Sequence, residues 1–268
     1  MGEKLKTAFC TGTYETFPIP LKDVLKRIAD AGYRNVEIGV TSHMPVKTSK
    51  KERADARAFL DSYSLEVASL HRVYPAKLSI ISTSASVRKA AIKYTKQVLK
   101  LASDLRAAII VVGRRDQELG VPFEKSKKWA LQAMNECKYL AEDLSVILGF
   151  EALNRYETAF INRIEDAVKF AKEINSEAVK IVADTYHMNI EEVNFSDPLV
   201  AAGKQLAHIH FADSNRQAPG MGHVNFSQVM EGLRKSGYNG CLSMEIAPIP
   251  DPDTAARKSL EFVQSLSA

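Results

Sequence analysis

Short apolar runs alternate with longer amphipathic segments along the whole chain. The apolar runs predict buried strands over residues 6–11, 35–40, 65–71, 107–113, 146–151, 179–184, 206–210 and 241–245. The amphipathic segments predict helices over residues 21–31, 47–63, 84–104, 123–142, 161–174, 197–204, 226–235 and 254–266. Regular strand–helix alternation is typical of a parallel sheet, and eight such units favour closure into an α/β fold of the (β/α)8 TIM barrel type.

The length of the chain agrees with one undivided barrel. It has 268 residues, and single barrels of this type commonly reach about 250 residues. No linker or low-complexity tract interrupts the pattern, so we expect a single domain over residues 1–268. The alternative is an open doubly wound sheet, which is disfavoured because no G-x-G-x-x-G or P-loop motif follows the first strand.

Four acidic or imidazole residues lie at the ends of four consecutive predicted strands. They are Glu151, Asp184, His210 and Glu245, and each follows the previous one by about one strand–helix–strand step. Because parallel strands end at the same edge of a sheet, these side chains are expected to meet at the carboxyl-terminal end of the barrel. Alternation along the strands allows all four to point into the interior. The competing interpretation is that such acids cap helices or form ion pairs.

Three carboxylates and one imidazole form a hard, oxygen-rich set of ligands. This set favours Mn²⁺ or Mg²⁺, with Co²⁺ as a further candidate, over a structural zinc ion. Glu151 and Glu245 come from strands three apart in a closed ring, so they are expected to reach a substrate from opposite faces. Paired carboxylates in that position suit proton removal and return at a carbon next to a carbonyl.

Two polar segments follow these strands at the same end of the predicted barrel. Asn154, Arg155 and Glu157 come after Glu151, and a Gly- and Pro-rich segment with Arg216 comes after His210. Loops at this end build the active sites of barrels, which favours a substrate-binding role for Arg216 over a plain surface role. His187 follows Asp184 by three residues and is open to three interpretations: a metal ligand, a donor to a substrate hydroxyl or a loop residue.

Composition narrows the class of protein. With 46% hydrophobic and 25% charged residues and a formal charge of +4, the chain is an ordinary globular protein without the charge of a nucleic-acid binder. Three widely spaced cysteines suit a reducing compartment. No apolar run approaches the roughly 20 residues of a membrane span, and the amino terminus does not resemble a signal peptide. A cytoplasmic protein without a nucleic-acid or membrane partner is expected.

Four segments resemble a known superfamily. FEALNRYET, VADTYHMNIEE, HIHFADSNRQAPGMGHVNF and SMEI are similar to the xylose-isomerase-like barrels, and most similar to the ketose 3-epimerase branch, which contains D-tagatose and D-psicose 3-epimerases. The resemblance covers about residues 146–247. It implies that Glu151, Asp184, His210 and Glu245 bind a divalent ion, usually Mn²⁺, with Glu151 and Glu245 exchanging the C3 proton of a ketose. It also implies that Glu157, His187 and Arg216 bind the O1–O3 end of that sugar.

The hypothesis is therefore a metal-dependent sugar epimerase that acts on a small ketose, as a homo-oligomer (dimer or tetramer). The enzyme alternatives are an aldose–ketose isomerase of the hydroxypyruvate type and an inosose dehydratase, since both suit the same metal site. A nuclease of the endonuclease IV type needs three zinc ions, and its ligand set is incomplete in this sequence. A barrel that binds a sugar without converting it is the alternative from another class.

Structural or secondary roles are expected for four other residues. Trp129 is expected to pack against the barrel wall, and His208 to lie inside the barrel one layer below His210. Arg114 and Arg115 follow the fourth strand, where they are either solvated or ion-paired, or meet a substrate phosphate.

Overall fold

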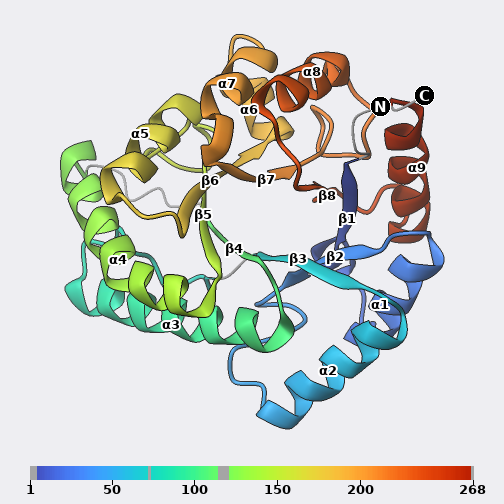
Figure 1. Ribbon diagram of the computed structural model, residues 1–268, viewed down its shortest axis with the longest axis horizontal. Coiled ribbons are helices and arrows are strands. Elements are labelled where there is room, and N and C mark those ends of the chain that lie inside the picture. Colours follow the sequence, from blue (N-terminus) through green and yellow to red (C-terminus); the bar gives the residue numbers. More distant parts are fainter. Residues whose placement is uncertain (1–4, 72–73, 114–120, 267–268) are drawn as a thin grey trace.

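Eight parallel strands close into a barrel in chain order (Figure 1). The computed structural model describes residues 5–71, 74–113 and 121–266. The last strand pairs with the first, with Ala8 opposite Ser243, so the sheet has no free edge. The strands are β1 (Lys6–Cys10), β2 (Asn35–Gly39), β3 (Glu66–His71), β4 (Ile109–Val112), β5 (Ile147–Glu151), β6 (Val179–Asp184), β7 (Leu206–His210) and β8 (Cys241–Met244). The predicted TIM barrel is confirmed.

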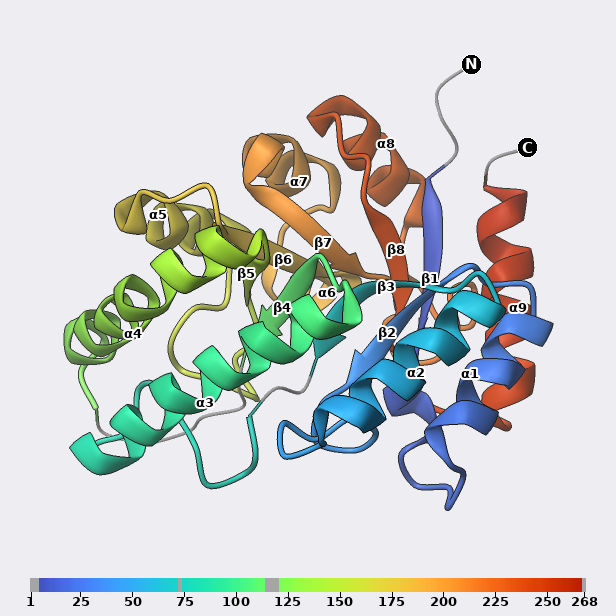
Figure 2. The same ribbon diagram turned by 60° about the horizontal axis from the view of Figure 1, so that its bottom comes forward.

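Helices surround the barrel and connect successive strands (Figure 2). The α-helices are α1 (Leu21–Asp30), α2 (Lys50–Ser62), α3 (Ala85–Leu105), α4 (Phe123–Leu144), α5 (Ile164–Ile174), α6 (Thr185–Glu191), α7 (Ser196–Ala202), α8 (Phe226–Ser236) and α9 (Pro252–Ser265). Two 3₁₀ helices, η1 (Thr11–Tyr14) and η2 (Gly203–Gln205), complete the described elements. Among the described residues, no helix combines the length and the apolar character needed to cross a membrane.

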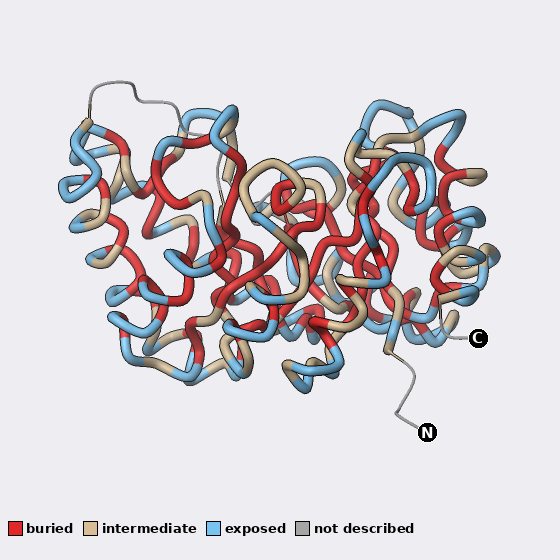
Figure 3. The backbone as a smooth tube through the Cα atoms, turned by 90° about the horizontal axis from the view of Figure 1, so that it is seen from above, coloured by how far each residue is buried: buried red, intermediate tan, exposed pale blue. Residues whose placement is uncertain are grey.

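The hydrophobic core lies between the strands and the surrounding helices (Figure 3). Val36 and Ile38 of β2 are fully buried in this core, while Glu37 between them is buried among polar groups of the barrel interior. The interior is tightly filled at Gly149 of β5, where an added Cβ would lie 2.7 Å from the side chain of Val182. The barrel is therefore a packed core, and only its ends can accept a ligand.

Several helix boundaries differ from the prediction because local capping sets them. α2 begins at Lys50 instead of residue 47, since Ser49 and Glu52 form a capping box. α5 begins at Ile164 instead of residue 161, and the carboxylate of Glu192 accepts the backbone N–H of Ile164 at 2.8 Å. The short helix α6 follows β6 directly and was not predicted, because Asp184 was assigned only to its strand.

The prediction for Trp129 was wrong. Its half-buried ring lies on the side of α4 that faces α3, with the guanidinium of Arg88 at 4.1 Å and the ammonium of Lys125 at 5.2 Å from its centroid. The interpretation of Arg114 and Arg115 concerns positions outside the described residues. The cysteines Cys10, Cys137 and Cys241 are buried and free.

Candidate active site

The four predicted strand-end residues meet at one point inside the barrel. Ligand atoms of Glu151, Asp184, His210 and Glu245 all lie within 4.8 Å of one another. Nδ1 of His210 is 2.8 Å from Glu151 Oε1, 3.1 Å from Glu245 Oε2 and 3.6 Å from Asp184 Oδ2. Three oxygens that accept hydrogen bonds and one imidazole nitrogen thus face a common centre.

The electrostatics of this group favour charged forms. Burial opposes ionisation of Asp184 and Glu245, but Arg216 and the neighbouring histidines hold the pKa of each carboxyl below its usual range. Burial would likewise lower the pKa of His210, yet Glu37, Glu151 and Glu245 raise it well above its ordinary value. The carboxyls of Asp184 and Glu245 are therefore held in their charged form by adjacent cationic groups, and this is the form that binds a metal ion.

Asp184 performs two tasks with its two oxygens. Oδ1 accepts the backbone N–H of Tyr186 at 2.8 Å and so caps α6, while Oδ2 faces His210. Asp184 therefore does cap a helix, which was the alternative to its interpretation as a metal ligand. The cap leaves the second oxygen in the cluster and also fixes the carboxylate plane.

Arg216 reaches the cluster from the loop that follows β7. Its guanidinium donates to Asp184 Oδ2 and to Glu245 Oε2. The backbone at Arg216 adopts a left-handed conformation with φ of 62°, uncommon for a residue with a side chain. Two hydrogen bonds hold it there: its N–H donates to Asp213 O at 2.9 Å, and its carbonyl accepts the N–H of Ala247 at 2.7 Å. The loop is built to aim this side chain inward.

Asp213 organises the same loop from within. Its carboxylate accepts the backbone N–H groups of Ser214, Gly220 and Val224 at 2.8–3.0 Å. Oγ of Ser214 lies 3.0 Å from Nδ1 of His223, which places that histidine in the loop, outside the cluster. These bonds turn the predicted polar segment into an ordered support for Arg216.

His187 and Glu157 border the cluster on the side of α6. Nε2 of His187 lies 3.7 Å from Asp184 Oδ2, and its Nδ1 accepts the side-chain amide of Asn154 at 2.7 Å. The same amide donates to Glu157 Oε1 at 3.3 Å. Asn154 thus orients both, while Arg155, also expected in the mouth, pairs at 2.7 Å with Glu191 and is mostly exposed.

Replacing Arg216 with alanine is expected to lower kcat/KM for a reaction at this cluster by about 10–100-fold, the worth of one charged hydrogen bond. With a divalent ion added, the melting temperature should change little, because an ion at the cluster would neutralise the carboxylates that Arg216 pairs with. Arg155→Ala, which removes a paired arginine from the adjacent loop, is the control. Steady-state kinetics and circular dichroism melting decide the matter, and unchanged kcat/KM returns Arg216 to a plain surface role.

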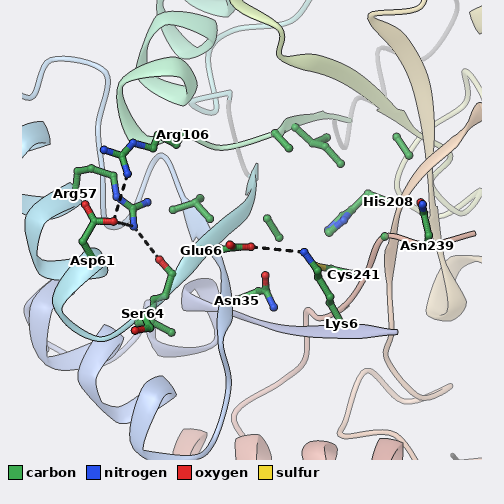
Figure 4. A pocket seen from close by; sticks show the side chains of 17 residues that line it. Lys6, Asn35, Arg57, Asp61, Ser64, Glu66, Arg106, His208, Asn239 and Cys241 are labelled. Carbon is green, nitrogen blue, oxygen red and sulfur yellow. Dashed lines mark hydrogen bonds and ion pairs between the residues drawn. The ribbon is translucent and has the colours of Figure 1, made fainter. Parts of the chain in front are cut away.

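A cavity of about 700 Å³ opens at the other, amino-terminal end of the barrel (Figure 4). Its ionic groups neutralise one another: Lys6 lies 3.7 Å from Glu66, and Asp61 is paired with Arg57 at 2.9 Å and Arg106 at 3.4 Å. A smaller pocket of about 200 Å³ lies at the carboxyl-terminal end and is bordered by Gly12, Glu15, Arg216 and Glu245. We assign the candidate site to the smaller pocket because Glu245 of the four-residue cluster and Arg216, which contacts Asp184, both border it.

A sequence profile described as "Xylose isomerase-like TIM barrel" matches residues 25–266. The chain belongs to this family. A D-psicose 3-epimerase of Enterocloster bolteae is 30% identical over 250 residues, which cover 91% of this chain and 82% of that protein. A 3-dehydro-D-guloside 4-epimerase of Escherichia coli is 33% identical over 144 residues, covering 53% of this chain and 55% of that protein.

A solved structure has the same fold. The D-psicose 3-epimerase of Clostridium cellulolyticum H10, determined with D-tagatose, superposes with a TM-score of 0.89 over 98% of this chain and 99% of that one, at 23% identity. This likeness extends over the whole barrel, including the amino-terminal half that carried no motif. The predicted family is confirmed, and these relatives of the chain are sugar epimerases.

In this member of the xylose isomerase-like family, three further interior residues lie beside the cluster: Cys10, Glu37 and His71. The sequence makes His71 a candidate pocket residue, because it ends the third predicted strand, but it gives Cys10 and Glu37 no role in the site. Sγ of Cys10 lies 2.9 Å from Nε2 of His71, and Nδ1 of His71 lies 3.6 Å from Glu245 Oε1. Glu37 is fully buried and contacts both His208 and His210. The available signal was a charged residue on the inward face of an apolar strand, NVEIG, to which no role was assigned.

These residues alter the electrostatics beneath the cluster. Burial would lower the pKa of His71, but Cys10 and Glu37 raise it to about 10. Burial opposes ionisation of Glu37, yet His210 and His71 hold the pKa of its carboxyl well below the usual range. The four-residue cluster therefore lies above a second, interior layer of charged groups.

Proposed function

We propose that the chain is a divalent-metal-dependent sugar epimerase that inverts C3 of a free ketose. The observation that carries the proposal is the convergence of Glu151, Asp184, His210 and Glu245 around one centre. Its membership of a family whose relatives include 3- and 4-epimerases of sugars supports the reaction class.

The residues present fit a divalent cation. Ligand atoms on one ion at about 2.0–2.2 Å are at most about 4.4 Å apart, so a cluster within 4.8 Å needs only a small contraction. The set of three carboxylates and one imidazole suits Mn²⁺, with Mg²⁺ and Co²⁺ as alternatives. Such an ion polarises the ketose carbonyl and offsets the negative charge that develops on the substrate.

Glu151 and Glu245 supply the proton transfers. They come from β5 and from the end of β8, and both carboxylates contact the same nitrogen of His210 from different sides of the ring of strands. One glutamate takes the proton from C3, leaving its electron pair in an enediolate across C2 and C3. The other glutamate delivers a proton to the opposite face of C3, which gives the epimer and restores the carbonyl.

Arg216, His187 and Glu157 are proposed to bind the O1–O3 end of the sugar. Arg216 and His187 both lie against Asp184, and Glu157 is joined to His187 through Asn154. Donors and acceptors therefore alternate along one wall of the site. That pattern suits adjacent hydroxyl groups, each of which donates one hydrogen bond and accepts others.

A second candidate is inversion at C4 of a 3-keto sugar, favoured by the 33% identity with the E. coli 4-epimerase. The same two glutamates would act, because C4 is adjacent to a carbonyl at C3 just as C3 is adjacent to one at C2. The two reactions differ only in which carbon lies between the carboxylates.

Incubation of the chain with Mn²⁺ and a panel of ketoses and 3-keto sugars in D2O separates these possibilities. The expected result, by NMR, is an epimeric product that carries deuterium at C3. Deuterium at C4 supports the second candidate, deuterium at C1 indicates an aldose–ketose isomerase, and loss of water indicates a dehydratase. A sugar that binds without conversion or exchange contradicts the enzyme assignment.

A further inference from the structure

Glu37 is buried inside the barrel and contacts Nε2 of the His210 ring. The three carboxylates of the cluster face the other ring nitrogen, Nδ1. Glu37 comes from β2, whereas the histidine comes from β7, so the contact crosses the interior. Its Oε2 lies 3.2 Å from Nε2 of His210 and 2.8 Å from Nε2 of His208, and it also accepts the hydroxyl of Ser69. Three donors from β3 and β7 thus converge on one carboxylate oxygen.

The direction of these hydrogen bonds sets the state of the imidazole. A carboxylate oxygen only accepts, so the proton in the contact with His210 must be on Nε2. The other ring nitrogen, Nδ1, faces the oxygens of Glu151 and Glu245 at 2.8 and 3.1 Å, so by the same rule it carries a proton while no ion is bound. A cation at the cluster would take the place of that proton, while Glu37 keeps the proton on Nε2. When Nδ1 carries no proton, it and these oxygens all present lone pairs to one another, and a cation between them relieves the repulsion.

We infer that Glu37 is a positioning residue that holds His210 in the tautomer and orientation in which Nδ1 is presented to the cation. The inference rests on the proposed function, because it concerns the ion that the four-residue cluster would hold. Carboxylates that accept the second N–H of a metal-binding histidine typically contribute about 10–100-fold to metal affinity. Glu37 acts through His210 and does not contact the substrate.

His208 and Ser69 hold Glu37 in place. His208 is 1% exposed and borders the inner end of the amino-terminal cavity in Figure 4. The N–H of His208 therefore reaches Glu37 from the side of the amino-terminal end of the barrel, while the N–H of His210 reaches it from the side of the carboxyl-terminal end. A carboxylate that accepts hydrogen bonds from both directions has little freedom to rotate, so it holds the imidazole ring of His210 in a fixed orientation.

Glu37 also belongs to a different group of ligand-type atoms. One atom each of Cys10, Glu37 and His71 lies within 4.8 Å of the others, and Glu37 Oε1 accepts no hydrogen bond from the described residues. If Glu37 were itself a ligand, this group would bind a second ion. The separation of 2.9 Å between Cys10 Sγ and His71 Nε2 matches a direct hydrogen bond and is short for two ligands of one ion, which favours the positioning role.

The experiment measures Mn²⁺ binding by electron paramagnetic resonance in the full chain and in Glu37→Gln. The expected result is one ion per chain in both, with Kd about 10–100-fold weaker in the variant. Glu192→Gln is the matched control, since Glu192 has a buried side chain whose carboxylate bonds to Arg163 and to the backbone of Ile164 and to none of the four cluster residues. Its Kd should stay within threefold. Saturating Mn²⁺ should restore most of the epimerase activity of Glu37→Gln.

A spectroscopic measurement distinguishes positioning from general support of the fold. In Mg²⁺-loaded protein with ¹⁵N-labelled histidine, His210 should show a protonated Nε2 and a coordinated Nδ1, and this pattern should weaken in Glu37→Gln. If that variant does not fold, Glu37→Asp, which keeps the charge but withdraws it from His210, should show the same loss of affinity.

Three outcomes overturn the inference. An unchanged Kd in a folded Glu37→Gln shows that His210 needs no such support. Binding of two ions by the wild-type chain, with one lost in Glu37→Gln, makes Glu37 a ligand. Absence of any Mn²⁺ binding by the wild-type chain overturns the proposed function itself. This result differs from the other two because it is seen in the wild-type chain alone, without comparison with Glu37→Gln.

Discussion

Glutamine in place of Glu151 or of Glu245 is expected to lower the epimerisation rate by at least about 10²–10⁴-fold. Glutamine keeps an oxygen near His210, to which both carboxylates are adjacent, but it cannot take a proton from carbon. A weakened metal site would deepen the loss. The double variant should fall little further, because the two residues act as one relay.

Isotope exchange tests the relay more sharply than rates alone. If each glutamate faces C3 of only one epimer, a single variant should still exchange the C3 proton of the epimer that faces the remaining base, while conversion stops. Measurement starts from each epimer in D2O, at saturating Mn²⁺, with Glu192→Gln as a variant that should keep full activity. A glutamate whose glutamine variant turns over normally with metal bound is only a ligand, and the two-base mechanism is then wrong.

The barrel and the convergence at its carboxyl-terminal end were predictable from the sequence because both follow from periodicity. A short apolar run that ends in Glu151 or His210 gives the strand, the inward face and the end of the sheet at once. Parallel pairing in chain order then brings consecutive strand ends together, and Asp184 lies opposite His210 in the observed register. Local pattern and global topology agree here, so the prediction needed no tertiary information.

The interior layer could not be predicted in the same way. Alternation places Glu37 inside the barrel, but which residues it meets depends on the stagger of strands on opposite sides of the ring. Its partner His210 is on β7, five strands further along the chain. The capping role of Asp184 was similarly hidden, because α6 has no apolar periodicity of its own and starts where β6 ends.

The carboxylates of Asp184 and Glu245 can be neutralised either by the guanidinium of Arg216 or by a bound metal ion. Arg216 pairs with Asp184 and Glu245, and these are two of the four residues proposed to hold the metal. A divalent ion at the centre would take over the neutralisation of these carboxylates and leave the guanidinium for a substrate oxygen. On this view Arg216 holds the acids together in the metal-free chain and binds substrate in the loaded one.

Removal of the metal is expected to abolish epimerisation, with a loss of at least about 10³-fold, since polarisation of the carbonyl by a bound ion is worth several kcal/mol. Stability should change too, because an ion that binds only the folded chain stabilises it by about 2.7 kcal/mol at 100 times its Kd. For a domain of this size that corresponds to an increase of roughly 5–10 °C in melting temperature. Activity and melting are measured after EDTA treatment and after addition of Mn²⁺, Mg²⁺ or Co²⁺.

The Asp184→Asn variant separates the metal from other effects of EDTA. Its amide can still cap α6 through oxygen, but it removes one negative charge from the cluster, so the increase in melting temperature with Mn²⁺ should shrink or vanish. Wild-type protein treated with EDTA should regain activity and stability together when Mn²⁺ is returned. Full turnover by protein shown by elemental analysis to be metal-free would rule out the metal-dependent mechanism, and the two glutamates would then have to act with side chains such as Arg216 in place of the ion.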